Sequence, residues 1–106
     1  MINAKYRVEG DTHTLTVLGH ANYAEYGKDI VCAGVSALVQ ALIGWIENND
    51  CSADFISIDE TGGEVIISCE GGERIATAFE VTTTGLEQIA YSYPDHMQID
   101  YIGTAD

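Results

Sequence analysis

One stretch of the chain carries no charge, and it limits what the rest can fold into. Ile30–Ile46, about 17 residues, lacks Asp, Glu, Lys and Arg, although the chain of 106 residues has a formal net charge of −13. Its length is at the low end for a membrane span, and polar residues such as Ser36 and Gln40 interrupt it. We therefore expect a buried helix from Ile30 to about Asn49 and no membrane partner.

Alternation of apolar and polar residues on both sides of this helix predicts strands with one buried face. The expected strands are residues 2–9, 12–19, 53–60, 64–70 and 97–101. Gly10-Asp11 and Thr61-Gly62-Gly63 are turn sequences that join them into hairpins. A second helix is expected from Gly71-Gly72 to Pro94, with a break at residues 81–85 because threonine and glycine are poor helix formers there.

The predicted fold is a single compact domain over residues 1–106, because a chain of this length has room for one core. The element order ββαββαβ places it in the α/β (α+β) class, with a mixed sheet covered by two helices. Gly34, Ala37, Ala41 and Gly44 form a smooth stripe along the first helix. We interpret the stripe first as tight packing on the sheet and second as a helix-to-helix dimer contact.

The composition excludes some partners. Seventeen carboxylates face four Lys and Arg, a balance that repels a phosphate backbone, so no direct nucleic-acid partner is expected. The negative charge can attract a basic ligand, or it can serve only to keep the protein soluble. No apolar segment follows a basic N-terminus, and three widely spaced cysteines predict neither disulfides nor zinc. We expect a cytoplasmic protein with free thiols and no metal or cofactor.

The segment GHANYAEYGKDIVCAGVS, residues 19–36, contains the candidate chemistry. Asp29 is a good N-cap for the first helix, and Cys32 then falls at the third helical position. Unpaired N–H groups and the positive end of the helix dipole stabilise a thiolate at that place. His20 follows a strand that can bring it to the same edge, where imidazole can accept the thiol proton and return it to a leaving amine.

A simpler interpretation stays open from the residues alone. A cysteine on an apolar helix is more often a small buried hydrophobic residue than a nucleophile, and a histidine after a strand is often a surface group. His13 and His96 compete with His20 as the base, but the first lies in a strand and the second in a turn after the only proline. Cys51 and Cys69 are interpreted as structural.

The segment resembles the signature of the bacterial ribosomal-processing cysteine proteases, the Prp family. That signature is Gly-His-Ala, a loop, Gly-x-Asp-Ile-Val-Cys-Ala, then a small residue, an aliphatic residue and Ser. The matching residues are Gly19, His20, Ala21, Gly27, Asp29, Ile30, Val31, Cys32, Ala33 and Ser36. Chain length and the ββαββαβ layout extend the resemblance over the whole chain.

The resemblance implies a homodimeric cytosolic protease that removes a short N-terminal extension from a basic protein of the large ribosomal subunit. It makes Cys32 the nucleophile and His20 the base, with Asp29 either orienting His20 or only capping the helix. The expected substrate-binding residues are Tyr23, Tyr26, Gly27 and Ser36. The first three belong to a loop that we expect to close over an extended peptide, and Ser36 lies one helical turn beyond Cys32. The alternative is an acidic adaptor that binds a basic ribosomal protein and cuts nothing.

Overall fold

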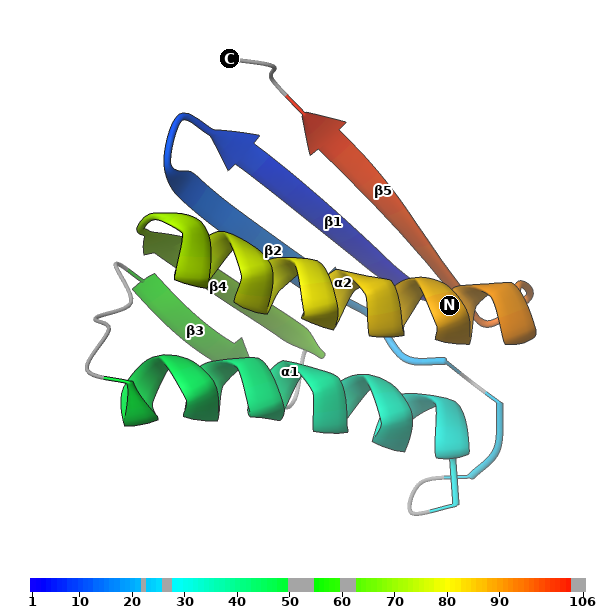
Figure 1. Cartoon of the computed structure of the whole chain (residues 1–106). Helices are drawn as coiled ribbons and strands as arrows, with labels where there is room; N and C mark the ends of the chain where they lie inside the picture. Colours follow the sequence, from blue (N-terminus) through cyan, green and yellow to red (C-terminus); the bar gives the residue numbers. More distant parts are fainter. Residues whose placement is uncertain (22, 26–27, 50–54, 60–62, 104–106) are drawn as a thin grey trace.

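A five-stranded sheet with two helices on one face forms the protein (Figure 1). The computed structural model describes residues 1–21, 23–25, 28–49, 55–59 and 63–103. In chain order the elements are β1 (Ile2–Glu9), β2 (Thr12–Leu18), α1 (Ile30–Asn48), β3 (Phe55–Asp59), β4 (Glu64–Glu70), α2 (Glu73–Ser92) and β5 (Met97–Gly103). The predicted order and the α+β class are confirmed. The predicted ends of β3 at Ala53 and Glu60, and most of the turn at 61–63, lie outside the described residues.

The sheet order places three chain segments at one edge. The strands run in the order β3-β4-β2-β1-β5, and β1 pairs antiparallel with β2 but parallel with β5. Asn3 therefore faces Leu18 at the end of β2, and Ile2 faces Met97 at the start of β5. The start of β1, the end of β2 and the start of β5 come together, on the side of Figure 1 where α1 begins and α2 ends.

The core lies between the sheet and the helices, as the alternation in the strands predicts. Ile2, Leu15 and Ile67 point from the sheet into it, and Phe79 and Leu86 meet them from α2. Along β2, the residues that alternate with the buried ones are only partly buried and point to the opposite face; they are Thr12, Thr14 and Thr16. A two-layer domain of this kind needs apolar side chains on one face of its sheet only.

The prediction that the small-residue stripe of α1 packs on the sheet is wrong. The residues of α1 that are buried in the core are Val31, Val35, Val39, Leu42 and Ile46. A Cβ added to Gly34 would lie 3.2 Å from Ile89 of α2, and Ala37 and Ala41 are exposed. The larger side chains take the sheet side because they bury more apolar area.

Within the described ranges, α1 is also the one helix long and apolar enough to cross a membrane. A helix of a globular core meets the same criterion, and the buried valines of α1 belong to the core cluster.

The predicted break at residues 81–85 is also wrong, because α2 is continuous from Glu73 to Ser92. The hydroxyls of Thr82 and Thr83 donate hydrogen bonds to the carbonyls of Ala78 and Glu80, at 2.9 and 3.1 Å. A Cβ at Gly85 would lie 2.8 Å from a methyl carbon of Leu38 on α1. Glycine thus lets the helices approach closely, and tertiary packing outweighs its low helix propensity.

A polar pair is buried under α2. The hydroxyl of Tyr6 and Nδ1 of His13 are 2.6 Å apart, and the ring of Phe79 stacks on both at 5.8 and 5.4 Å between centroids. Burial lowers the pKa of His13 from its ordinary value of 6.5, and the nearby carboxylate of Asp11 opposes this only in part. His13 is therefore a residue of the core, on β2.

Acid is expected to destabilise the fold through His13. Because the pKa of His13 is lower in the folded state, its contribution to the free energy of unfolding is complete above pH 6.5, the ordinary pKa. This contribution is lost as the pH falls through the folded-state pKa. Urea unfolding at about pH 7.5 and about pH 5.5 measures the effect. Wild type should lose more unfolding free energy than His13→Asn, whose amide can bond Tyr6 but does not titrate. Equal losses in the two proteins would contradict this role.

Candidate active site

Two glycines position the strand end that delivers His20. Gly19 has a φ of 103°, a left-handed conformation that favours glycine, and a Cβ there would lie 2.5 Å from the carbonyl oxygen of Met1. Its N–H donates to the carbonyl of Gly63 at 2.8 Å. A Cβ at Gly63 would lie 2.8 Å from Nε2 of His20, so the imidazole of this exposed histidine rests against Gly63.

Asp29 joins the start of α1 to the loop before it. It is the N-cap, as predicted, and its Oδ1 accepts the N–H groups of Val31 and Cys32 at 3.0 Å each. Its Oδ2 accepts the N–H of Tyr23 at 2.9 Å and that of Ala24 at 3.4 Å. Burial raises the pKa of this carboxyl, but the four N–H donors together leave it below its ordinary value of 3.8. Both oxygens are thus engaged with the backbone.

Cys32 lies at the third position of α1, as predicted, and is partly exposed. The N–H of Ala21 donates to its sulfur at 3.4 Å. Backbone donors and the positive end of the helix dipole both favour negative charge at this sulfur. Cys32 thus differs from Cys69, which is fully buried, although its side chain also packs against the core.

The structure brings Cys32 to the residue that follows His20, but it does not join the two side chains. Among the described residues, no hydrogen bond connects the imidazole of His20 to the sulfur. Contacts between a base and its nucleophile often tighten only when substrate is bound. The assignment of His20 as the base remains a prediction.

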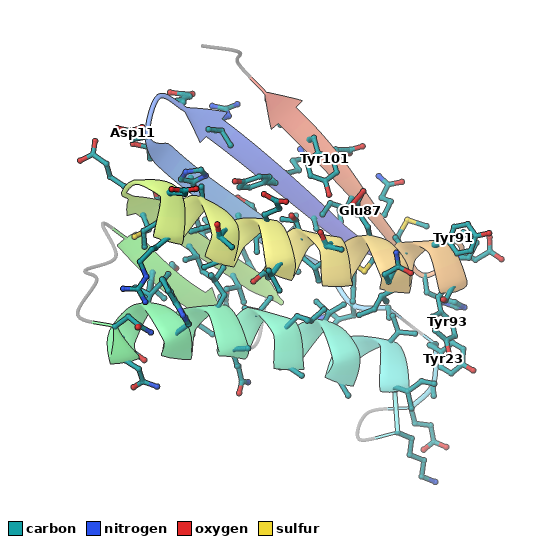
Figure 2. All side chains as sticks on the ribbon, in the orientation of Figure 1. Asp11, Tyr23, Glu87, Tyr91, Tyr93 and Tyr101 are labelled. Carbon is teal, nitrogen blue, oxygen red and sulfur yellow. The ribbon has the colours of Figure 1, made fainter. Side chains whose placement is uncertain are left out.

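The predicted substrate-binding residues are only partly described. Tyr23 is 43% exposed, and its ring meets that of Tyr93 edge to face at 5.3 Å between centroids (Figure 2). It meets the ring of His96 in the same way, at 5.2 Å between centroids. Ser36 is exposed and accepts a hydrogen bond from Gln40 at 3.2 Å. Tyr26 and Gly27 lie outside the described residues, as does Cys51.

His96 is a neighbour of the site that the sequence analysis considered as a competing base and set aside. Its Nδ1 lies 2.9 Å from the carbonyl oxygen of Ala21, a residue 75 positions away in sequence. The parallel pairing of β1 with β5 creates this contact, and no local motif around His96 predicts it.

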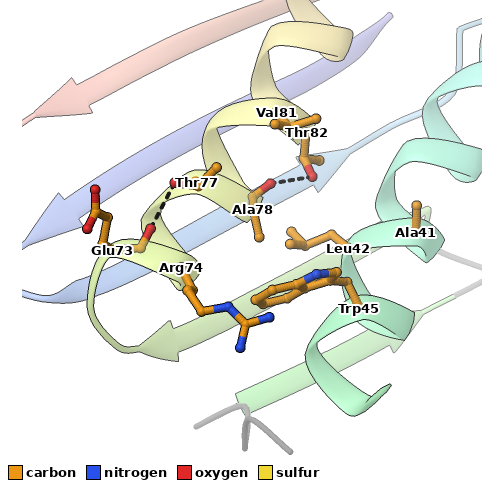
Figure 3. Close-up of a pocket in the computed structure, with 9 residues that line it drawn as sticks. All are labelled: Ala41, Leu42, Trp45, Glu73, Arg74, Thr77, Ala78, Val81 and Thr82. Atoms are coloured by element: carbon orange, nitrogen blue, oxygen red, sulfur yellow. Dashed lines mark hydrogen bonds between the residues drawn. The ribbon is translucent and has the colours of Figure 1, made fainter. Parts of the chain in front are cut away.

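A separate groove of about 530 Å³ lies between the two helices, farther along α1 (Figure 3). Ala41, on its rim, is roughly 13 Å along the helix axis from Cys32. At its other end the guanidinium of Arg74 lies 5.4 Å from the centre of the Trp45 ring. In the part of the chain that the structure describes, no three side chains of His, Cys, Asp or Glu form a group that could hold a metal ion.

A thiol at a helix N-terminus, which accepts a backbone N–H and lies near a strand end followed by a histidine, fits the class of enzymes that cleave acyl bonds with a cysteine. The comparison with protein families then names the group. The model of the family Peptidase_Prp, described as cysteine protease Prp, matches residues 1–98. The chain belongs to this family and is a cysteine protease.

Named relatives and solved structures agree with the assignment. Ribosomal processing cysteine protease Prp of Mycoplasma genitalium is 35% identical over 91 residues, which cover 81% of this chain and 85% of the relative. The protein of the same name from Bacillus subtilis is 30% identical, covering 93% and 96%. An essential ribosomal processing protease Prp from S. aureus, with a covalently linked product peptide, has a TM-score of 0.87 and 26% identity over 96% of this chain and 100% of that one.

Two substitutions of Asp29 should separate its two structural tasks. Asparagine keeps one oxygen for the helix N–H groups but places an amide donor where Oδ2 accepts from Tyr23 and Ala24. Asp29→Ala should lower the unfolding free energy by about 1 kcal/mol through loss of the cap, and Asp29→Asn by clearly less. Amide exchange at Tyr23 and Ala24 should accelerate in both variants. An Asn variant as unstable as the Ala variant would contradict this division.

Proposed function

We propose that this cysteine protease removes a short N-terminal extension from a basic protein of the large ribosomal subunit, in the cytoplasm, and so supports ribosome assembly. The N–H contact on the Cys32 sulfur carries the catalytic part of the proposal. The names of the relatives support the ribosomal part, since they are called ribosomal processing proteases. A second S. aureus structure holds a substrate peptide and has a TM-score of 0.80 with this chain.

The proposed reaction uses Cys32 and His20. The sulfur attacks the carbonyl carbon of the scissile peptide bond, and the imidazole, having taken the thiol proton, gives it to the leaving amine. A thioester to the N-terminal extension remains on Cys32. Water then attacks this thioester, its proton passes to His20, and release of the carboxylate product returns the proton to the sulfur.

Charge and aromatic side chains suit this substrate. The formal charge of −13 attracts a basic protein and accelerates its encounter. Tyr23, exposed beside the site, offers a ring to an apolar residue of the extension, and Ser36 lies one helical turn beyond Cys32. Tyr26 and Gly27 are proposed to complete the peptide site. No direct contact with nucleic acid is included in the proposal.

Cleavage of the extended ribosomal protein tests the function. Wild type, Cys32→Ala and Cys32→Ser are incubated with it, and intact masses are recorded. Wild type should release a short N-terminal peptide, and both Cys32 variants should leave the substrate whole while keeping the wild-type circular dichroism spectrum. Cys51→Ala is the control for loss of a thiol elsewhere in the chain. Cleavage by a Cys32 variant would overturn the mechanism, and tight binding without cleavage by wild type would identify an adaptor.

We also propose a homodimer that forms through the outer face of α1. From Ile30 to Ile46 this helix carries no charge, and its exposed residues include Ile30 itself, 57% exposed, and Ala37. In a chain with a net charge of −13, such a face lets two copies meet without bringing carboxylates together. The groove beside Ala41 continues this surface toward α2.

Light scattering after gel filtration tests the dimer. Wild type should show twice the chain mass of 11.4 kDa. Ala37→Glu, which puts like charges at the contact, should shift the protein to the monomer, while Gln88→Glu on the exposed side of α2 should leave the dimer intact. A monomeric wild type, or equal effects of the two substitutions, would contradict this interface.

A further inference from the structure

His96 lies outside the motif around Cys32, yet it contacts the same backbone. Nδ1 of His96 and the carbonyl oxygen of Ala21 are 2.9 Å apart, and a carbonyl only accepts, so Nδ1 must carry the proton and donate. The N–H of the same alanine donates to the sulfur of Cys32 at 3.4 Å. One residue therefore connects the imidazole of His96 to the nucleophile.

Ala21 is held from three directions. Its methyl group is in the core and 1% exposed, its N–H meets the sulfur, and its carbonyl meets His96. Packing of the methyl group in the core and the N–H contact with the sulfur leave the carbonyl end of Ala21 to be held by His96. Without the bond from His96, the carbonyl end of Ala21 loses its anchor, so the residue can shift as a whole and carry its N–H away from the sulfur.

We propose that His96 is a positioning residue of this protease, which acts through Ala21 to keep a backbone N–H directed at the Cys32 sulfur. The inference rests on Cys32 as the nucleophile and not on the identity of the substrate. It gives the site a third contributing element, the start of β5, besides the end of β2 and the start of α1.

His96 is itself firmly placed, as a positioning residue must be. Its N–H donates to the carbonyl of Tyr93 at the end of α2 at 2.9 Å, and its carbonyl accepts the N–H of Ile2 on β1, also at 2.9 Å. The ring of Tyr23 packs edge to face on its imidazole at 5.2 Å between centroids. The backbone of His96 thus couples the site to a helix end and to a strand.

Three substitutions separate a donor from a ring that merely packs. His96→Asn places an amide N–H close to the position of Nδ1 and removes the ring. His96→Phe keeps a ring against Tyr23 and removes the donor, and His96→Ala removes both. A positioning role therefore predicts that Asn resembles wild type and that Phe does not, whereas a packing role predicts the reverse order.

The experiment measures alkylation of Cys32 by iodoacetamide across pH, resolved by peptide mass because the chain has two further thiols. Near neutral pH the rate should fall about three- to tenfold in His96→Phe and His96→Ala, and its rise with pH should move to higher pH. His96→Asn should stay within about twofold of wild type. Circular dichroism checks folding, and if the Phe variant does not fold, the comparison of Ala with Asn decides.

Equal alkylation rates in wild type and all folded variants would overturn the role of His96 while leaving the proposed protease function intact. A loss in Asn with none in Phe would also overturn it and assign packing alone. Slow alkylation of Cys32 already in wild type would instead contradict the nucleophile, and with it both proposals.

Discussion

The site depends on the position of β1 between an antiparallel and a parallel neighbour. The antiparallel partner β2 ends where β1 starts, and the parallel partner β5 starts there too. His20 follows β2 at this edge, and His96 directly precedes β5 at the same edge. The chain returns to this edge at the start of α1, where the sulfur of Cys32 meets the N–H of Ala21. Changing the direction of either neighbour would separate these residues by the length of a strand.

Backbone groups, rather than basic side chains, create the electrostatic environment of the nucleophile. The chain has four Lys and Arg against seventeen carboxylates, so a thiolate gains little from surrounding cations. The N–H of Ala21 and the positive end of the α1 helix dipole supply positive partial charge instead. Asp29 contributes indirectly, because its two oxygens fix both the first turn of the helix and the loop at Tyr23. An enzyme with a net charge of −13 can in this way stabilise negative charge at its site without a cluster of basic side chains.

The sequence was sufficient for the parts of the site that are local. Asp29 and Cys32 are three residues apart, so capping rules predict their relation, and alternation predicts all five strands. The contact of His96 with Ala21 could not be predicted, since it arises from pairing between strands at opposite ends of the chain. The face of α1 that meets the sheet was predicted wrongly because no charged residue between Ile30 and Ile46 marks the solvent side, and small residues recur at helical spacing as regularly as the larger apolar ones. The continuity of α2 depends on Gly85 packing against Leu38, a tertiary contact that propensity ignores.

Activation of Cys32 by the start of α1 is tested by the reactivity of the three cysteines of the unmodified protein toward limiting iodoacetamide at neutral pH, with each site followed by peptide mass. We expect Cys32 to be alkylated at least about tenfold faster than Cys51, and Cys69, which is 0% exposed, to react only on unfolding. If Cys32 reacts no faster than Cys51, the start of α1 does not activate the thiol. In that case the edge formed by β1, β2 and β5 is not the catalytic centre.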